Sequence, residues 1–430
     1  MTLLAREVSD ENQAELLSRY RRVRAETEAL ADPLSAEDMQ LQSMPDASPS
    51  KWHLAHTTWF FETFILRNAL PGYRVFDSHY HELFNSYYNS LGTPFSRPQR
   101  GLLSRPDLES VFSYRRAVDF AMRELLSEYP IPDTLVSLVT LGLNHEQQHQ
   151  ELLLTDIKHA FSINPLLPAY TDFSFDPEEE ETAAPDLQWL EIPGGAYAIG
   201  AEGDHFYFDN ESPAHQQLVQ DFQVASRLVT NREFVDFIED GGYRDPRLWL
   251  SDGWSLVQRE RWAKPLYWQQ REGRWMQFTL GGLMPLVDGE PACHLNFYEA
   301  DAFATWAGKR LLTEAEWEVA ACQLRRPDQL ASANLLEKRQ LRPLAAGAGH
   351  NQFLGDLWEW TSSAYLPYPG FRASADAVGE YNGKFMCNQK VLRGGSCITP
   401  ADHIRMTYRN FFYPHQGWQF TGIRLAGDPV

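Results

Sequence analysis

The chain has 430 residues and a mass of 49.4 kDa, which predicts two or three domains, because one hydrophobic core rarely serves more than about 250–300 residues. Hydrophobic residues make up 43% of the sequence and aromatic residues 13%, enough apolar surface to exclude global disorder. The formal net charge of −20 argues against a nucleic-acid or anionic-membrane partner, since both are bound through Lys and Arg side chains.

The N-terminus and the cysteine content predict a cytoplasmic protein. The first residues soon become charged and lack the apolar segment of a signal peptide, and no apolar run reaches the roughly 18 residues that span a bilayer. Four cysteines without a CxxC pair are too few for a disulfide framework, so we expect reduced, buried thiols. The oligomeric state stays open.

The first 165 residues contain four segments with helical periodicity, separated by breaks rich in Pro, Gly and Asn. Four amphipathic helices in one unit predict an antiparallel bundle. The second helix is expected to open at Ser48-Pro49 and to stop at Pro71-Gly72, and a long connection follows it. The four segments are 11–31, 48–71, 108–128 and 134–162.

A second domain is expected after an acidic stretch at residues 176–181. From Trp189 onward, short segments rich in Trp and Tyr alternate with Gly, Pro and Asn, which indicates an irregular α+β domain. We therefore predict a bundle over residues 1–170, a linker over 171–187 and an α+β domain over 188–430. Short helices are expected at 231–238, 298–307 and 314–321.

Histidines on two predicted helices are candidate metal ligands. His145 and His149 lie one turn apart on the fourth helix, on a stripe that should face the bundle interior. His56 lies on the inward stripe of the second helix, whereas His53 lies to its side, and Glu151 points away from His149. Three neutral imidazoles would suit Fe(II), Zn(II) or Cu(II), and the spacing alone also fits histidines that are simply buried in a core.

The connection between these helices carries tyrosines and arginines. Tyr87 or Tyr88 could donate a proton or an electron near an oxygen-activating metal. Arg97 and Arg100 have a spacing that suits bidentate capture of a carboxylate. Packing for the tyrosines and surface ion pairs for the arginines are the competing interpretations.

Several sequence motifs of five to fourteen residues indicate a protein family more specifically together than any one of them does alone. In the N-terminal half they resemble the hercynine-dependent sulfoxide synthases of ergothioneine biosynthesis, whose bundle is DinB-like. In the C-terminal half they resemble the formylglycine-generating enzymes (sulfatase-modifying factors), which have a C-type-lectin-like fold. The N-terminal strings are 51–64 (KWHLAHTTWFFETF), 85–89 (NSYYN), 97–106 (RPQRGLLSRP) and 145–151 (HEQQHQE). The C-terminal strings are 310–318 (RLLTEAEWE), 355–361 (GDLWEWT), 391–396 (VLRGGS) and 421–425 (TGIRL).

The resemblance covers nearly the whole chain and implies a mononuclear non-haem Fe(II) enzyme. Such an enzyme uses O₂ to join a thiol sulfur to C2 of the imidazole of hercynine, giving a sulfoxide. It also implies that Gln148 hydrogen-bonds the hercynine imidazole and that Asn410 reaches the hercynine carboxylate. By motif position, the iron ligands would be His56, His145 and His149.

The resemblance also indicates the sulfur donor. Arg97 and Arg100 would bind the donor carboxylate. Relatives that use γ-glutamylcysteine tend to carry Trp-Asp where this chain has Phe411-Phe412, so the chain resembles the subgroup that accepts free cysteine, with these two residues beside the substrate. In that subgroup a tyrosine pair, here Tyr87-Tyr88, lines the oxygen side, and motif position favours Tyr88 as the proton source.

Other functions remain open at this point. A formylglycine-generating copper oxidase needs a close cysteine pair after the Arg-Gly-Gly-Ser motif, but Cys397 stands there alone. A selenoneine synthase using a selenosugar, or an ovothiol-type synthase joining cysteine to histidine, would keep the same metal ligands. A non-catalytic lectin-like binding protein is the remaining alternative.

Overall fold

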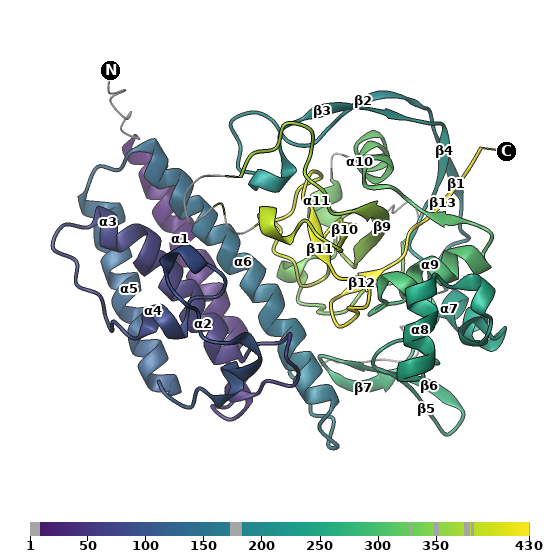
Figure 1. Ribbon diagram of the computed structural model, residues 1–430, viewed down its shortest axis with the longest axis horizontal. Helices are drawn as coiled ribbons and strands as arrows, with labels where there is room; N and C mark the ends of the chain where they lie inside the picture. The colour runs from purple at the N-terminus through teal and green to yellow at the C-terminus, as the bar shows by residue number, and fades with distance from the viewer. Residues whose placement is uncertain are drawn as a thin grey trace. The chain divides into compact units, whose positions relative to one another are not determined.

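The computed structural model describes residues 9–172, 183–326, 328–347, 352–373, 379 and 382–429 (Figure 1). The chain forms two compact units, Met1–Pro165 with Ser374–Tyr381, and Leu166–Ala373 with Asn382–Val430. The acidic stretch at 176–181 lies outside the described residues. The domain boundaries drawn from the sequence, 1–170, 171–187 and 188–430, therefore stay a prediction.

Four long helices dominate the described part of the N-terminal unit (Figure 1). They are α1 (Asp10–Ala31), α2 (Ser50–Phe60), α5 (Leu108–Glu128) and α6 (Asp133–Ser162). Helix α2 runs on through a π-helical segment, η2 (Phe61–Leu66), into α3 (Arg67–Ala69). The predicted start of this helix was wrong by one residue, because Pro49 is the N-cap and the Ser48 hydroxyl accepts a hydrogen bond from Arg100 instead of capping the helix.

The long connection between α3 and α5 is built from short helices. They are α4 (Tyr80–Leu83), η3 (Asn89–Leu91) and η4 (Arg97–Leu102), and η1 (Asp38–Gln40) lies between α1 and α2. Helix α5 begins where the Asp107 carboxylate accepts a hydrogen bond from the Ser110 N–H, which satisfies one of the free donors of its first turn.

Close contact between α2 and α6 depends on a glycine. A Cβ atom at Gly142 would lie 2.8 Å from ring atoms of both Phe60 and Phe61, closer than side chains tolerate. The Phe60 ring also contacts His145, with the ring centroids 4.9 Å apart. A glycine one turn before His145 therefore lets these aromatic rings pack directly against α6.

The C-terminal unit combines short helices with small sheets, as expected for a lectin-like α+β domain. Its first sheet has the order β1-β4-β13-β8, and its second has the order β11-β10-β9-β12, in which only the β12–β9 pair is parallel. The strands β2 and β3 form a pair, and β5, β6 and β7 form a meander. The last strand, β13, pairs with β4, which places the C-terminal end of the chain in the first sheet.

The strands are β1 (Trp189–Ile192), β2 (Gly195–Ile199), β3 (His215–Val219), β4 (Phe222–Ala225), β5 (Trp268–Arg271), β6 (Arg274–Thr279), β7 (Gly282–Pro285), β8 (Arg310–Leu311), β9 (Trp358–Ala364), β10 (Lys390–Arg393), β11 (Asn410–Phe412), β12 (Thr421–Gly422) and β13 (Leu425–Gly427). The α-helices are α7 (Asn231–Glu239), α8 (Ser251–Glu260), α9 (Phe297–Trp306), α10 (Glu314–Gln323) and α11 (Gln329–Ser332). Short 3₁₀ turns are η5 (Asp209–Glu211), η6 (Gly242–Arg244), η7 (Pro246–Leu248), η8 (Leu336–Lys338) and η10 (Gly383–Phe385). The three short helices expected here match α7, α9 and α10 to within two residues at each end.

Residues of the C-terminal motifs form buried ion pairs. Arg424 lies 2.7 Å from Glu359, and Arg393 lies 2.6 Å from Glu318, with all four side chains at most 5% exposed. The turn after Arg393 needs Gly394, whose φ is +99° and whose Cβ would meet a backbone oxygen at 2.8 Å. Each pair joins two motifs that are far apart in the sequence, and the loss of either partner would leave an uncompensated charge inside the fold.

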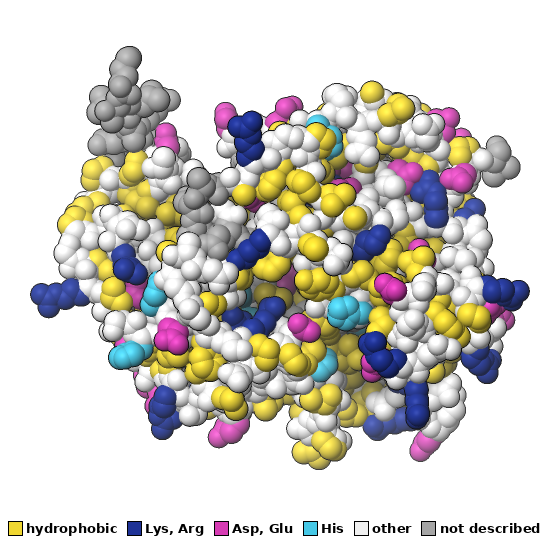
Figure 2. Space-filling model, in the orientation of Figure 1, with side chains coloured by type: hydrophobic (Ala, Val, Ile, Leu, Met, Phe, Trp, Pro, Cys, Tyr) yellow, Lys and Arg dark blue, Asp and Glu magenta, His cyan; other side chains and the backbone are white. Residues whose placement is uncertain are grey.

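The surface carries charges of both signs, and the cysteines differ in their burial. On the face shown in Figure 2, basic and acidic side chains are interspersed. Within the described residues, no helix combines the length and the apolar character needed to cross a membrane. No disulfide joins the four cysteines, all of which lie in the described residues. Only Cys293 and Cys397 are buried, so the expectation of buried thiols was wrong for Cys322 and Cys387.

Three helices of the C-terminal unit begin with a capping box, in which a glutamate three residues after the N-cap bonds back to it. In α7 and α10 that glutamate is also paired with an arginine. In α9 the equivalent Glu299 instead accepts a hydrogen bond from the Tyr243 hydroxyl at 2.5 Å. Burial without a cationic partner raises the pKa of Glu299 to about 7.

We predict that the stability of Glu299→Gln relative to the wild type is greater at pH 8 than at pH 5.5. The native state retains a proton on Glu299 that the unfolded state loses above its lower pKa, so rising pH costs the wild type stability, by about 3 kcal/mol in total. The amide cannot ionise, and the Tyr243 hydroxyl can accept from it. The difference in melting temperature between variant and wild type at the two pH values measures this. Glu316→Gln, at the same position in α10, should show no such gain, and equal behaviour of both variants would contradict the assignment.

Candidate metal centre

Three histidine side chains meet in the core of the N-terminal unit. His56 comes from α2, and His145 and His149 come from α6. Each offers one ring nitrogen, and these nitrogens all lie within 4.8 Å of one another. All three side chains are buried. The structure therefore brings together the three histidines that the sequence singles out.

The ring of His56 is held firmly in one orientation. Its Nδ1–H donates to the backbone oxygen of Phe84 at 2.6 Å, which leaves the lone pair on Nε2. The ring is stacked between two indoles, with centroid distances of 4.5 Å to Trp52 and 5.7 Å to Trp59. The Nε2 atoms of His56 and His145 lie 3.2 Å apart.

Burial keeps the three imidazoles neutral. It lowers the pKa of His145 to about 4, and it lowers the pKa values of His56 and His149 well below the ordinary value, with the neighbouring histidines lowering them further. Neutral imidazoles have the lone pairs that metal binding needs. Two nitrogens that share one ion at about 2.1 Å, at tetrahedral or octahedral angles, lie about 3.0–3.4 Å apart, so the spacing of His56 and His145 fits a metal.

A fourth histidine and a carboxylate lie behind His149. The Nδ1 atoms of His53 and His149 are 2.8 Å apart, and His53 Nε2 is 3.0 Å from an oxygen of Asp156. Burial lowers the pKa of His53 although the hydrogen bond to Asp156 opposes this. The sequence pattern placed His53 beside the inward stripe and gave it no part in the site.

A buried carboxylate next to His145 connects all four long helices. Glu146 is fully buried and contacts Arg24 of α1 at 3.0 Å and Arg115 of α5 at 2.6 Å. Burial opposes its ionisation, but the two guanidinium groups hold the pKa of Glu146 below its usual value. Arg24 and Arg115 also donate to Thr58 and Thr57 of α2, the residues that follow His56.

Arg100 is a buried cation near the histidines. Its guanidinium stacks on Trp52 at 3.4 Å and donates to the hydroxyls of Ser48 and Ser86. Among the described residues it forms no ion pair, and its Nε–H has no acceptor. Burial, helped by the nearby Arg97, lowers the pKa of Arg100 well below its ordinary value. A buried guanidinium in this state favours an anionic ligand.

The two candidate tyrosines lie on the connection before η3. Asn85 clamps this turn by accepting from the Tyr88 N–H and donating to the Tyr88 carbonyl. The buried Tyr88 ring packs on Trp59 at 5.7 Å, and the Tyr87 ring lies 4.7 Å from it. Trp59 therefore lies between Tyr88 and His56 in this stack of rings.

The remaining candidates lie in different surroundings. Arg97 is exposed on η4, and Gln148 is half-buried on α6 beside His149. Asn410, Phe411 and Phe412 lie on β11 of the C-terminal unit, where the Phe411 ring stacks on Tyr365 at 4.1 Å. Their roles in substrate binding stay predictions.

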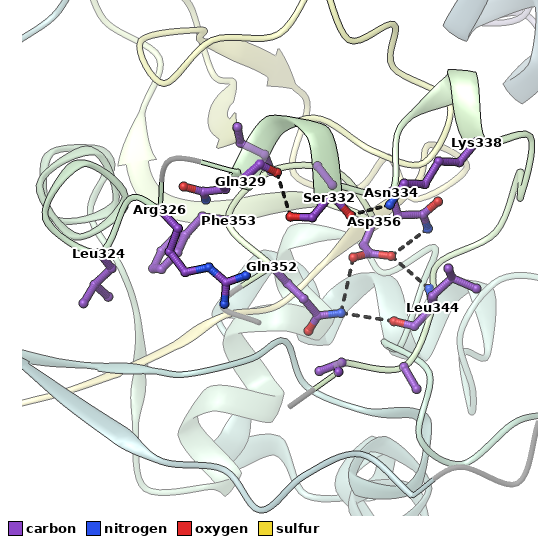
Figure 3. Close-up of a pocket in the computed structure, with 15 residues that line it drawn as sticks. Leu324, Arg326, Gln329, Ser332, Asn334, Lys338, Leu344, Gln352, Phe353 and Asp356 are labelled. Atoms are coloured by element: carbon purple, nitrogen blue, oxygen red, sulfur yellow. Dashed lines mark hydrogen bonds between the residues drawn. The ribbon is translucent and has the colours of Figure 1, made fainter. Parts of the chain in front are cut away.

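The C-terminal unit also contains a cavity of about 260 Å³ (Figure 3). The buried carboxylate of Asp356 lines it and accepts hydrogen bonds from Asn334, the Leu344 N–H and Gln352. These donors hold together a loop in which Gln352 and Asp356 both have a positive φ. Because its oxygens already face three donors, Asp356 stabilises this loop rather than offering a ligand position for a cation.

Comparisons with known proteins match both halves of the chain. Residues 19–153 match the DinB superfamily, and residues 175–341 and 340–429 match the sulfatase-modifying factor enzyme 1-like domain. The chain is 31% identical over 420 residues to a hercynine oxygenase of Mycolicibacterium smegmatis, covering 91% of this chain and 94% of the relative. It is 32% identical to a hercynine oxygenase of Mycobacterium tuberculosis, covering 95% and 97%. The chain belongs to the hercynine oxygenase family.

Membership in the hercynine oxygenase family confirms the expected resemblance and the expected fold class. A helical DinB-like bundle is followed by a C-type-lectin-like domain of the formylglycine-generating type. A formylglycine-generating enzyme of Thermomonospora curvata is also similar, at 26% identity, but it covers only 56% of this chain. The hercynine oxygenases match over more than 90% of the chain and therefore cover both units.

Sequence reasoning missed three residues that shape the histidine cluster. His53 contacts His149, Asp156 contacts His53, and Glu146 braces the helix that carries His145. The available signals were a second histidine one turn before His56, an aspartate two turns after His149, and a glutamate inside a buried stretch of helix.

We predict that Glu146→Gln lowers the stability of the protein by about 3–5 kcal/mol. Arg24 and Arg115 would lose the fully buried carboxylate that they share, and their other partners, Asp119 and Glu28, are partly exposed. Thermal unfolding followed by circular dichroism measures this. Glu109→Gln removes an exposed pair with Arg116 and should change the melting temperature far less. Equal effects of the two substitutions would show that the Glu146 network does not hold the bundle together.

Proposed function

We propose that this protein is a non-haem Fe(II) enzyme that joins the sulfur of cysteine to C2 of the hercynine imidazole. The reaction consumes one O₂: the imidazole C–H and the thiol S–H bonds break, a C–S bond forms, one oxygen ends on sulfur and the other leaves as water. The product would be hercynylcysteine sulfoxide, an intermediate of ergothioneine biosynthesis. The observation that carries this proposal is the convergence of three neutral, buried imidazoles near the Arg100 guanidinium, which has no ion-pair partner among the described residues.

The donor set supports an open metal site. His56, His145 and His149 would hold the ion through Nε2, and three protein ligands leave positions for thiolate, imidazole and O₂. When bound, Fe(II) would supply oxygen activation and a site where the thiol is held as thiolate. The surrounding Trp52, Trp59 and Phe60 rings keep bulk water away from the histidines.

Arg100 supports the assignment of an amino-acid thiol as the sulfur donor. Its guanidinium lies over Trp52, whose ring in turn contacts His56 and His149. A carboxylate bound here would place a thiol two carbons away near the ion. We assign Arg100, helped by the more exposed Arg97, to the cysteine carboxylate.

The remaining roles follow from the family resemblance. Tyr88, held by Asn85 and packed on Trp59, is our candidate proton donor on the oxygen side, with Tyr87 beside it. Gln148, one residue before His149, is proposed to bind the hercynine imidazole, and Asn410 its carboxylate. We also assign the β11 residues Phe411 and Phe412 to the substrate, as the cysteine-using subgroup implies.

We predict that the iron-loaded protein forms the sulfoxide product from hercynine and cysteine. Protein reconstituted with Fe(II) without oxygen, mixed with hercynine and cysteine and then exposed to air, should give hercynylcysteine sulfoxide, detected by mass spectrometry. His145→Ala should abolish both iron binding and product. Parallel reactions with γ-glutamylcysteine, a selenosugar, or histidine in place of hercynine test the competing donors and acceptors. Preferential turnover of any of these would overturn the substrate assignment.

The second prediction concerns Arg100. Arg100→Met should raise the KM for cysteine about 10- to 100-fold, because one charge-assisted contact to the carboxylate is lost. Cysteamine, which has the thiol but no carboxylate, should be turned over equally by variant and wild type. Arg116→Met, at an exposed ion pair on α5, is the matched control and should leave both values unchanged. An unaltered cysteine KM in Arg100→Met would make this arginine structural.

A further inference from the structure

Hydrogen bonds link Asp156 to His53 and His53 to His149. Which atom donates in each bond decides which nitrogen of His149 is left to bind a metal. We propose that Asp156, acting through His53, is a positioning residue that keeps the proton of His149 on Nδ1 and so leaves its Nε2 lone pair for the metal. This inference rests on the proposed metal site and extends it to two residues outside the set of ligands.

The geometry places four atoms in sequence. An oxygen of Asp156 lies 3.0 Å from His53 Nε2, and His53 Nδ1 lies 2.8 Å from His149 Nδ1. Both distances are those of hydrogen bonds, and all three side chains are at most 8% exposed, so water does not compete for them. Since His149 uses Nδ1 for this contact, Nε2 is the nitrogen that it can offer to an ion.

The carboxylate determines which way each hydrogen bond runs. An ionised aspartate can only accept, so His53 Nε2 must be the donor to Asp156. A neutral His53 then has its lone pair on Nδ1 and accepts the Nδ1–H of His149. The opposite arrangement would put the proton of His149 on Nε2 and block metal binding there. Carboxylate or carbonyl partners of this kind commonly set the tautomer of metal-binding histidines.

His56 is held by a simpler version of the same device. Its Nδ1–H donates to a backbone carbonyl, that of Phe84, which cannot reverse its role. An imidazole behind His149 could act in either direction by itself. The carboxylate at the far end of the chain removes this ambiguity, which gives a physical reason for a buried aspartate at this position of α6.

Asp156 is also linked through Ser48 to Arg100, the arginine proposed to bind the substrate. The same oxygen accepts the backbone N–H of Ser48 at 2.8 Å, and the Ser48 hydroxyl accepts from Arg100 at 2.9 Å. One carboxylate therefore orients a metal ligand on one side and the anion-binding guanidinium on the other. We expect changes at Asp156 to affect both metal affinity and the KM for cysteine, and changes at His53 to act mainly on metal affinity.

Metal affinity measured without turnover tests the proposal. Co(II) is titrated anaerobically into the apoprotein against a chromophoric chelator, for wild type, His53→Leu, His53→Asn and Asp156→Leu. His53→Leu removes the acceptor and should weaken Co(II) binding about 10- to 100-fold. His53→Asn places an amide oxygen close to the position of Nδ1 and should restore binding to within about threefold of the wild type. Asp156→Leu removes the acceptor for His53 and Ser48 and should weaken binding and raise the cysteine KM.

Two controls separate the chain from general effects on the fold. His159→Leu removes a histidine of α6 that bonds to Ser43 and should leave Co(II) affinity unchanged. His145→Ala should abolish Co(II) binding. If His145→Ala binds Co(II) like the wild type, the proposed metal site itself is wrong.

If His145→Ala loses Co(II) while His53→Leu keeps wild-type affinity, or if His53→Asn is as weak as His53→Leu, the metal site stands and the role of His53 and Asp156 is overturned. Circular dichroism reports whether each variant folds. Should His53→Leu not fold, Asp156→Leu, which removes the acceptor, decides: weaker Co(II) binding supports the proposal, and unchanged Co(II) binding refutes it.

Discussion

The need to neutralise one buried carboxylate organises the N-terminal unit. Glu146 carries its charge into the middle of the bundle, where Arg24 from α1 and Arg115 from α5 balance it. The same two arginines bond to the threonines that follow His56, and Glu146 directly follows His145. Both helices that carry the histidine cluster are thus braced one residue away from their ligands. An ion pair of this kind adds little net stability, but breaking it is costly, so it favours one arrangement of the helices over others.

Arg100 differs from the other buried arginines of this protein in its partners. In the C-terminal unit, the arginines of the family motifs are matched by glutamates of other motifs, as Arg393 is by Glu318 and Arg424 by Glu359. Arg100 is as deeply buried, yet serine hydroxyls and an indole ring are its partners. A charge left without a counter-ion in a packed interior is unfavourable unless a ligand supplies one. This contrast separates arginines that hold the fold from the one that we assign to substrate.

The histidine cluster and the proposed anion site share their supports. Trp52 stacks against both His56 and Arg100, and Asp156 bonds to both Ser48 and His53, the histidine that contacts His149. A thiol substrate that must bind a metal through sulfur and an arginine through its carboxylate needs these two groups at a fixed separation. Because the same rigid residues contact both the histidine cluster and Arg100, they hold these two groups at a fixed separation. The cost of such an arrangement is that few of the supporting residues can change independently.

The sequence by itself determined the helices of the bundle, because their apolar periodicity and their Pro and Gly breaks act over a few residues, and α5 was predicted with its observed bounds. It also indicated His56, His145 and His149, since a stripe on a helix shows which side chains turn inward. The roles of His53, Asp156 and Glu146 were decided only by the tertiary structure. Their hydrogen bonds join residues about 30 to 120 positions apart, as in the contacts His53–Asp156 and Arg24–Glu146. Polar side chains at such separations leave no periodic signal, and only the packing of the helices brings their atoms within bonding distance.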